Sequence, residues 1–324
     1  MMEKRRLIDV ISGFNNKRIA VLGDIVIDKY VYGRVERVNP ENPGAPLLKI
    51  EKKEFRLGCA ANVALNISSL KAKALLGGVI GMDGNGRLIQ KLSRKYGLDL
   101  FYVKNGKTIV KERSIESEFN QYLLRADDGE FNLKAINEND ENKLVNLLQK
   151  NKFDAIILSD YNKNLFKNNL AKKIIEFAKD KNIPVVVDPK PVNALSFQSS
   201  TLICPNLKEA REIVDSNSEE PKYLAKRLKE IIKSKYIIVT CGKNGMLCYD
   251  GKEFTVIPTK VREVVDVTGA GDTVCAVVTL GLASGLDLVE AAHLANYAAG
   301  IVVEKQGTSS VSKDELIKRI NEDS

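Results

Sequence analysis

The segment at residues 266–273, DVTGAGDT, holds residue types that could bind an anion and move a proton. Two glycines and an alanine stand before an apolar stretch at 274–282, which is typical of a buried helix. Amides at a helix N-terminus lack partners within the helix, and the helix dipole favours an anion beside them. Gly269, Ala270 and Gly271 are therefore candidates for an anion hole.

Asp272 follows these glycines directly, and its carboxylate would repel an anion bound there. One interpretation is that Asp272 accepts a proton from an attacking hydroxyl beside a phosphoryl group. The alternative is a helix cap, because aspartate is common at helix N-termini. The spacing alone leaves both interpretations open.

The composition narrows the classes of function. The chain has 324 residues, of which 44% are hydrophobic and 28% charged, as in an ordinary globular protein with a sizeable core. Its only histidine, His293, excludes a His-Glu-x-x-His site and leaves no choice of base for a Ser-His-Asp triad. Five scattered cysteines form no Cys-x-x-Cys, so we expect neither a disulfide framework nor structural zinc.

The net charge of +8 raises the question of nucleic acid binding. Lys and Arg are interleaved with Asp and Glu, and no basic run exceeds three residues, so we expect no nucleic acid partner. An attraction for phosphorylated small molecules fits the same charge. The longest apolar runs are about half a membrane span, and no secretory signal is evident, so we expect a cytoplasmic protein without membrane contact.

The elements that must position these residues alternate between strand and helix. Helices are expected at 60–70 and 86–96, and further helices alternate with short apolar strands from residue 138 onward. Such alternation indicates βαβ units and a mainly parallel sheet with covered faces. The expected strands of this body are 17–23, 74–81, 155–158, 184–187, 202–204 and 236–240.

Polar residues follow these strands, which a purely structural fold would not require. In a sheet of this kind the ligand lies beyond the carboxyl ends of the strands. No P-loop pattern occurs, and no Gly-x-Gly-x-x-Gly follows the first strand, so two common nucleotide sites are unsupported. The candidate positions are Gly23 and Asp24, Ser159 and Asp160, Asp188 and Lys190, Pro205 and Asn206, and Cys241 and Gly242.

Two charged segments, at approximately 29–56 and 104–127, show the alternation of half-exposed strands. We predict that they form a small antiparallel β-sheet inserted into a single domain that spans residues 1–324. Such a sheet has exposed edges and a face to bury. It could therefore act as a lid over a site or as the surface of a homodimer.

Four motifs together resemble the ribokinase/PfkB family of carbohydrate kinases. Residues 266–272 are similar to its carboxy-terminal signature, 58–62 (GCAAN) to its glycine-rich motif, 206–209 (NLKE) to its Asn-x-x-Glu, and 240–245 (TCGKNG) to its Thr-x-Gly-x-x-Gly. They occur in the family's order and spacing along nearly the whole chain. The resemblance implies a ribokinase-like three-layer α/β/α sandwich with a mainly parallel sheet and a small β-sheet lid, and an ATP-dependent carbohydrate kinase.

Further stretches resemble the branch that phosphorylates D-glycero-β-D-manno-heptose 7-phosphate at the anomeric O1, in ADP-heptose and lipopolysaccharide core precursor synthesis. Two alternatives stay open: another PfkB kinase of a sugar, sugar phosphate or nucleoside, and a non-catalytic nucleotide or sugar sensor. Bifunctional relatives add a nucleotidyltransferase domain, so the chain is either a stand-alone kinase or a domain of a longer protein. The stretches are 23–24, 28–30, 57–66, 158–163, 187–190 and 296–307.

The sequence departs from this branch where Cys59 replaces a glycine, where Asn162 and Asn164 replace glycines, and where Cys241 replaces a larger residue. Asparagine tolerates the left-handed backbone, so the turn at 162–164 can survive. None of these departures alters Asp272. They bear on the identity of the sugar more than on the reaction.

The resemblance implies a role for each candidate. Asp272 is the base that deprotonates the sugar hydroxyl, and the amides of Gly269, Ala270 and Gly271 stabilise the transferring phosphoryl group. Residues expected to bind the sugar or its phosphate are Asp24, Asp28, Gly58, Asn62, Arg113, Asp160, Lys163 and Lys190. Residues expected near ATP are Asn206, Glu209, Thr240, Gly242, Gly245 and Asn296.

Metal ions are implied as well. Glu209 is expected to bind Mg2+ through water, although Asn206 and Glu209 also have the spacing of a capping box. Asp266 and Thr268 resemble the loop that binds a monovalent cation in the family, and the cation implied is K+. The expected partners are therefore ATP, Mg2+, K+ and a sugar phosphate.

Overall fold

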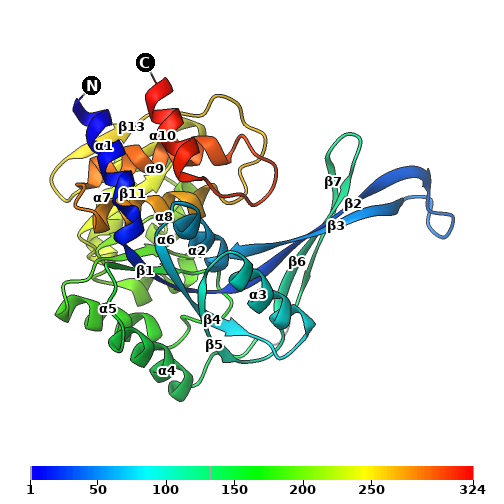
Figure 1. Ribbon diagram of the computed structural model, residues 1–324, viewed down its shortest axis with the longest axis horizontal. Helices are drawn as coiled ribbons and strands as arrows, with labels where there is room; N and C mark the ends of the chain where they lie inside the picture. The colour runs from blue at the N-terminus through cyan, green and yellow to red at the C-terminus, as the bar shows by residue number, and fades with distance from the viewer. Residues whose placement is uncertain (1, 131–132, 324) are drawn as a thin grey trace.

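The computed structural model describes residues 2–130 and 133–323, and its body is a nine-stranded sheet between two layers of helices (Figure 1). The strands lie in the order β13-β12-β11-β10-β9-β8-β1-β4-β5. Neighbours from β11 to β5 are parallel, whereas β12 and β13 are antiparallel additions at one edge. The bounds are β1 Arg18–Gly23, β4 Lys73–Ile80, β5 Asp99–Lys104, β8 Ala155–Ser159, β9 Val185–Asp188, β10 Leu202–Ile203, β11 Tyr236–Thr240, β12 Met246–Tyr249 and β13 Phe254–Ile257.

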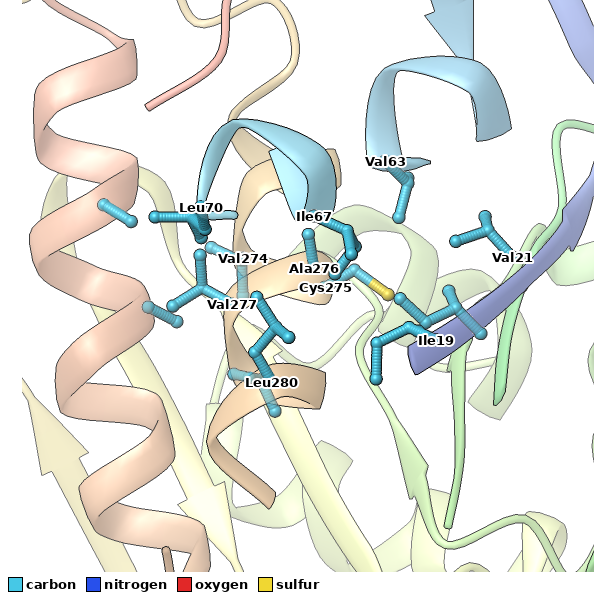
Figure 2. Close-up of a cluster of buried hydrophobic side chains, with 14 of the residues drawn as sticks. Ile19, Val21, Val63, Ile67, Leu70, Val274, Cys275, Ala276, Val277 and Leu280 are labelled. Carbon is cyan, nitrogen blue, oxygen red and sulfur yellow. The ribbon is translucent and has the colours of Figure 1, made fainter. Parts of the chain in front are cut away.

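Alternate residues of β1 face different helix layers, as expected for a strand buried on both sides. Ile19 and Val21 pack into one hydrophobic cluster, and Ala20 and Leu22 into the other. Figure 2 shows the first cluster, where side chains of α2 and α8 meet those of β1. The predicted three-layer α/β/α sandwich is confirmed.

The first cluster is covered by α1 Met2–Ser12, α2 Ala60–Ser69, α3 Gly84–Lys95, α8 Ala270–Ala283, α9 Leu288–Val302 and α10 Lys313–Glu322. The second is covered by α4 Glu138–Gln149, α5 Leu170–Asp180, α6 Leu207–Val214 and α7 Pro221–Ile232. Short 3-10 turns lie at Phe14–Asn16, Pro191–Phe197 and Gly242–Asn244. Among the described residues, no helix is long and apolar enough to cross a membrane.

Two long hairpins form a second sheet that projects from the body in Figure 1, and we call it the lid sheet. Its strands are β2 Ile25–Val38, β3 Pro46–Cys59, β6 Ile109–Glu116 and β7 Gln121–Asp128, in the order β3-β2-β6-β7. Each hairpin is antiparallel, but β2 and β6 pair in parallel, so the expectation of a wholly antiparallel sheet is wrong. β2 and β6 are the first strands of their hairpins and both run outward from the body. Because they are neighbours, they pair in parallel.

The carboxyl ends of β1, β8 and β9 meet beside the base of the lid sheet. Gly23 pairs with Ser159, and Ser159 pairs with Asp188, so the polar residues that follow these strands are brought together. Helix α2 begins at the same place, because the amide of Ala60 donates to the carbonyl of Asp24 at 3.1 Å. The strand ends, α2 and the lid sheet therefore enclose one region of the molecule.

Candidate active site

Asp272 lies buried in the first turn of α8, with one hydrogen-bond donor on each carboxylate oxygen. Nδ2 of Asn62 donates to Oδ2 at 2.8 Å, and the hydroxyl of Tyr161 donates to Oδ1 at 2.7 Å. The N-cap of α8 is Gly269, and no side chain caps this helix. The capping interpretation of Asp272 is therefore excluded, since its carboxylate bonds to side chains of other elements.

Burial raises the pKa of Asp272 from 3.8 to about 6, although the hydrogen bonds from Asn62 and Tyr161 act in the opposite direction. Asp28 adds to the increase, and the positive charge of Lys111 opposes it. A carboxylate of this kind is ionised at neutral pH and is a better proton acceptor than an exposed one. Its arrangement suits general base chemistry.

The N-terminus of α8 differs in part from the expected anion hole. Gly269 has a φ of 86°, and a Cβ there would lie 3.0 Å from Nδ2 of Asn62, which favours glycine. The amide of Ala270 donates to the carbonyl of Val267 at 3.2 Å and is not free for a ligand. Gly271 is exposed, and among the described residues its amide has no acceptor.

Asp28 lies on β2 of the lid sheet, close to the body, and both of its carboxylate oxygens are held. Arg113 donates to Oδ1 at 2.6 Å, and the hydroxyl of Thr308 donates to Oδ2 at 2.9 Å. A Cβ at Gly58 would lie 2.4 Å from Oδ2 of Asp28, so this position has no room for a larger residue. The structure thus brings together Asp28, Gly58 and Arg113, which stay predicted substrate-binding residues, and adds Thr308.

Asp24 and Asp160 hold the loop after β8. Oδ2 of Asp24 accepts from the amides of Tyr161 at 2.8 Å and Lys163 at 3.1 Å. Asp160 accepts from the amide of Lys190 at 3.1 Å and from side-chain and backbone groups of neighbouring asparagines. Burial raises the pKa of both carboxylates, to about 6 for Asp24. Both aspartates position the loop that carries Tyr161.

The three cations predicted to bind a sugar phosphate each have a carboxylate partner. Arg113 pairs with Asp28, Lys163 lies 2.6 Å from Glu130, and Lys190 pairs with Glu209. Their charges are therefore already compensated within the protein.

Asn206 and Glu209 form the capping box that the sequence allowed. Oδ1 of Asn206 accepts from the amide of Glu209 at 2.9 Å, and Oε2 of Glu209 accepts from the amide of Asn206 at 3.0 Å. Burial, and next the charge of Glu209, raise the pKa of Asp188 well above its usual value. Among the described residues, no cluster of three or more His, Cys, Asp or Glu side chains could hold a metal ion.

The segments expected to hold a nucleotide converge near β11 and β13. Thr240 forms a parallel bridge with Asn206. Gly245 has a φ of 82°, and a Cβ there would lie 2.0 Å from the carbonyl oxygen of Ile257. Nδ2 of Asn296 donates to the carbonyl of Pro258 at 2.7 Å, so this side chain supports the same loop. Gly242 is exposed, with a φ of 56° and open space where a side chain would be.

Asp266 and Thr268 lie in the loop before α8, beside the lid sheet. Oδ1 of Asp266 accepts from the amide of Thr268 at 2.9 Å, and Oδ2 accepts from the hydroxyl of Tyr122 at 3.1 Å and the amide of Gly307 at 3.0 Å. Burial favours the neutral acid, but these hydrogen bonds prevail and lower the pKa of Asp266. The Asp266 carboxylate is therefore ionised at neutral pH.

The family model for the pfkB family carbohydrate kinases matches residues 16–315 of this chain. The chain belongs to this family. Membership of this family makes it a carbohydrate kinase.

Curated relatives of this kinase include the bifunctional protein HldE of Haemophilus influenzae, 38% identical over 315 residues and 95% of the chain, and HldE of Coxiella burnetii, 38% identical over 319 residues and 96% of the chain. The chain spans 64% and 65% of the length of these relatives. Phosphofructokinase-2 of Escherichia coli, with potassium, matches with a TM-score of 0.77 and 19% identity, covering 94% of this chain and 98% of that one. Ribokinase of Thermotoga maritima matches with a TM-score of 0.72 and 24% identity, covering 94% and 99%. These two structures show the fold.

Besides Thr308, two side chains of this kinase that contact the site were not among the predicted site residues. Tyr161 stands inside the 158–163 stretch, and Lys111 inside the charged 104–127 segment, so their positions were noted without a role. Tyr161 directly follows Asp160, a candidate residue at a strand end, and this position was the signal that could have identified it. Lys111 had none, because 50 Lys and Arg residues are spread along the chain.

Proposed function

We propose that this kinase transfers the γ-phosphoryl group of ATP to the anomeric O1 of D-glycero-β-D-manno-heptose 7-phosphate. The product, the 1,7-bisphosphate, serves ADP-heptose and lipopolysaccharide core precursor synthesis. Identity of 38% to the HldE proteins over 95% of the chain supports this substrate. The stretches at 57–66 and 158–163, which resemble the heptose branch, support it too.

The observation that carries the proposal is the buried Asp272 with its two fixed donors. In the proposed reaction Asp272 takes the proton of the attacking hydroxyl as the oxygen approaches the γ-phosphorus. The γ-phosphorus–oxygen bond to ADP breaks, and ADP leaves. The amide of Gly271 at the open N-terminus of α8 faces the developing negative charge.

Asn62 supports a hydroxylated acceptor beside Asp272. Its Nδ2 is committed to Asp272, while its Oδ1 is buried with no hydrogen-bond partner among the residues that the structure describes. A buried amide oxygen without a donor is costly, and a sugar hydroxyl would satisfy it. Asp28 and Gly58 would flank the same sugar, with Asp24 and Asp160 holding the loop above it.

On the nucleotide side, we assign Asn206, Thr240, Gly242 and Gly245 to the ATP cradle, with Asn296 supporting its wall. Glu209 would hold Mg2+ through water, and Mg2+ would neutralise charge on the ATP phosphates. The ionised Asp266 and the carbonyls around Thr268 would hold K+ near the N-terminus of α8. The related phosphofructokinase-2 has been crystallised with potassium, which supports this choice of cation.

We also propose that two copies associate through the lid sheet in the cytoplasm. It exposes large apolar side chains, among them Phe119 at 76% in the turn between β6 and β7, Leu124 at 63% on β7 and Val38 at 62% at the end of β2. Apolar side chains gathered on one projecting sheet favour burial against a second copy.

A coupled assay of ADP release with Mg-ATP tests the proposed reaction. The acceptor panel is D-glycero-D-manno-heptose 7-phosphate, fructose 6-phosphate, ribose and adenosine. We expect turnover on the heptose phosphate alone. Turnover on another acceptor would keep the phosphoryl transfer and discard the heptose assignment. Silence on all four with ATP still bound would favour a non-catalytic sensor.

A further inference from the structure

Lys111 is a lysine whose charge is buried beneath the lid sheet. It lies on β6, in register with Asp28 of β2, and is only 9% exposed. Its Nζ lies 3.4 Å from Sγ of Cys59 and 5.1 Å from the centre of the Tyr161 ring. The Tyr161 hydroxyl donates to Asp272, so the ammonium lies beside the side chains that surround this carboxylate.

The neighbouring cations are paired, but Lys111 is not. Arg113, two residues further along β6, forms an ion pair with Asp28. Among the described residues no carboxylate forms an ion pair with the Lys111 ammonium, whose contacts are the thiol and the aromatic ring. Lys111 thus contributes a positive charge that no carboxylate contacts among the described residues, and that acts only at longer range on Asp272 and on Asp127 of β7.

The thiol cannot act as the counter-ion. Burial raises the pKa of Cys59, so Sγ stays a neutral thiol and a weak acceptor. The face of the Tyr161 ring attracts a cation only modestly. A buried ammonium costs several kcal/mol unless a charged partner compensates it. Lys111 is therefore in an unfavourable environment in the free protein. Residues that bind a charged ligand are often kept at such a cost in stability.

We propose that the Lys111 ammonium is an anion-binding group of the acceptor pocket, and that its partner is a phosphate oxygen brought in by the substrates. This inference rests on the proposed phosphoryl transfer. The oxygen belongs either to the phosphate that the acceptor already carries or to the phosphoryl group in transfer. In both cases binding of the substrates supplies the charge that the protein withholds.

The first test uses Lys111→Met, which keeps the length of the side chain and removes the charge. We expect the free variant to unfold at a higher temperature than the wild type, because a buried unpaired charge has been removed. We also expect inorganic phosphate to raise its unfolding temperature less than it raises that of the wild type. Neither readout depends on the identity of the sugar, so failure of the heptose assignment would not affect them.

The matched control is Lys29→Met on β2 of the same sheet. Lys29 is ion-paired with Glu112 at 2.5 Å, so its loss should not stabilise the protein and should leave the response to phosphate unchanged. If Lys111→Met is less stable than the wild type and responds fully to phosphate, then Lys111 is a structural residue and the proposal is wrong. Lys111→Arg, which keeps the charge, should retain part of the phosphate response even where Lys111→Met folds poorly.

A second measurement separates the two sources of the oxygen. Calorimetry gives the Kd of the acceptor from the panel that shows turnover, and of a non-hydrolysable ATP analogue. If the acceptor's phosphate is the partner, Lys111→Met should weaken acceptor binding about 10- to 100-fold and leave the analogue unchanged. If the phosphoryl group in transfer is the partner, Lys111→Met should keep both wild-type Kd values and have a lower kcat than the wild type. Wild-type values for Kd and kcat together would overturn the proposal.

Discussion

The hydroxyl of Tyr161 donates a 2.7 Å hydrogen bond to Oδ1 of Asp272, while the backbone amide of the same tyrosine donates to Asp24 at 2.8 Å. One residue thus links the loop after β8, the end of β1 and the first turn of α8. The ammonium groups of Lys111 and Lys190 lie 5.1 Å and 5.2 Å from the centre of the Tyr161 ring. Tyr161, which orients the Asp272 carboxylate, is therefore held through its amide, its ring and its hydroxyl.

Asp272→Asn should lower turnover by about 10²–10⁴-fold, the usual effect of removing a general base. Asparagine can still accept from Asn62 through its oxygen and donate to the oxygen of Tyr161, so the fold and ATP binding should be kept. The measurement is kcat in the ADP-release assay, with ATP binding measured by calorimetry. Asp180→Asn, at an exposed position on α5, is the control and should turn over normally. Near wild-type turnover in Asp272→Asn would rule out the proposed base.

Tyr161→Phe should shift the acid limb of the kcat–pH profile to higher pH. The hydrogen bond from Tyr161 lowers the pKa of Asp272, so its loss lets burial raise that pKa above its present value of about 6. Asn62, Asp28 and Lys111 also face this carboxylate and are unchanged in the variant. The check is kcat across a pH range that spans 6, with Tyr223→Phe, an exposed tyrosine on α7, as the control. A profile that falls in height without moving would mean that Tyr161 acts on packing alone.

The sequence predicted the body of the fold well, because the strands of a doubly covered sheet are short apolar runs between helices. Strand β5 and the edge hairpin of β12 and β13 were not among the expected strands. The mixed polarity of β5 and β13 reflects their place at the two edges of the sheet, where one side is open to solvent, whereas β12 is a short and fully buried strand. The parallel pairing of β2 with β6 could not be foreseen either, because alternation along a strand carries no information about the direction of its neighbour.

The candidate site shows the same division. Motif residues such as Asn62 and Asp272 meet as the resemblance implied. Other residues with suggestive chemistry are committed within the protein: Asp160 holds backbone and side-chain groups of nearby loops, and Lys163 pairs with Glu130. A sequence shows which residues carry charge but not which charges neutralise one another. For that reason the unpaired Lys111 is evident only in the structure.

Gly58→Ala should weaken acceptor binding and destabilise the protein. The added Cβ would lie 2.4 Å from Oδ2 of Asp28, so the carboxylate must leave its bonds with Arg113 and Thr308. We expect KM for the acceptor to rise more than KM for ATP, because Asp28 belongs to the acceptor side. Gly84→Ala at the start of α3 is the control, since its Cβ would meet nothing closer than 3.9 Å. Equal rises in both KM values would place Asp28 outside the acceptor pocket.

Asp272→Asn should also change how stability depends on pH. The pKa of Asp272 is about 6 in the folded protein and 3.8 in the reference state, so the folded state binds the proton more tightly. The stability that protonation contributes is fully present below pH 3.8 and is lost as pH rises through about 6.

Above that pH the wild type keeps a buried charge that the variant lacks, so Asp272→Asn should be more stable by up to about 3 kcal/mol. The advantage should shrink as pH falls and disappear near pH 4, roughly at the reference pKa. Urea unfolding of the wild type, Asp272→Asn and Asp180→Asn at several pH values measures it, and Asp180→Asn corrects for the loss of one formal charge. A stability gain that is the same at every pH would show that ionisation of Asp272 is not its cause.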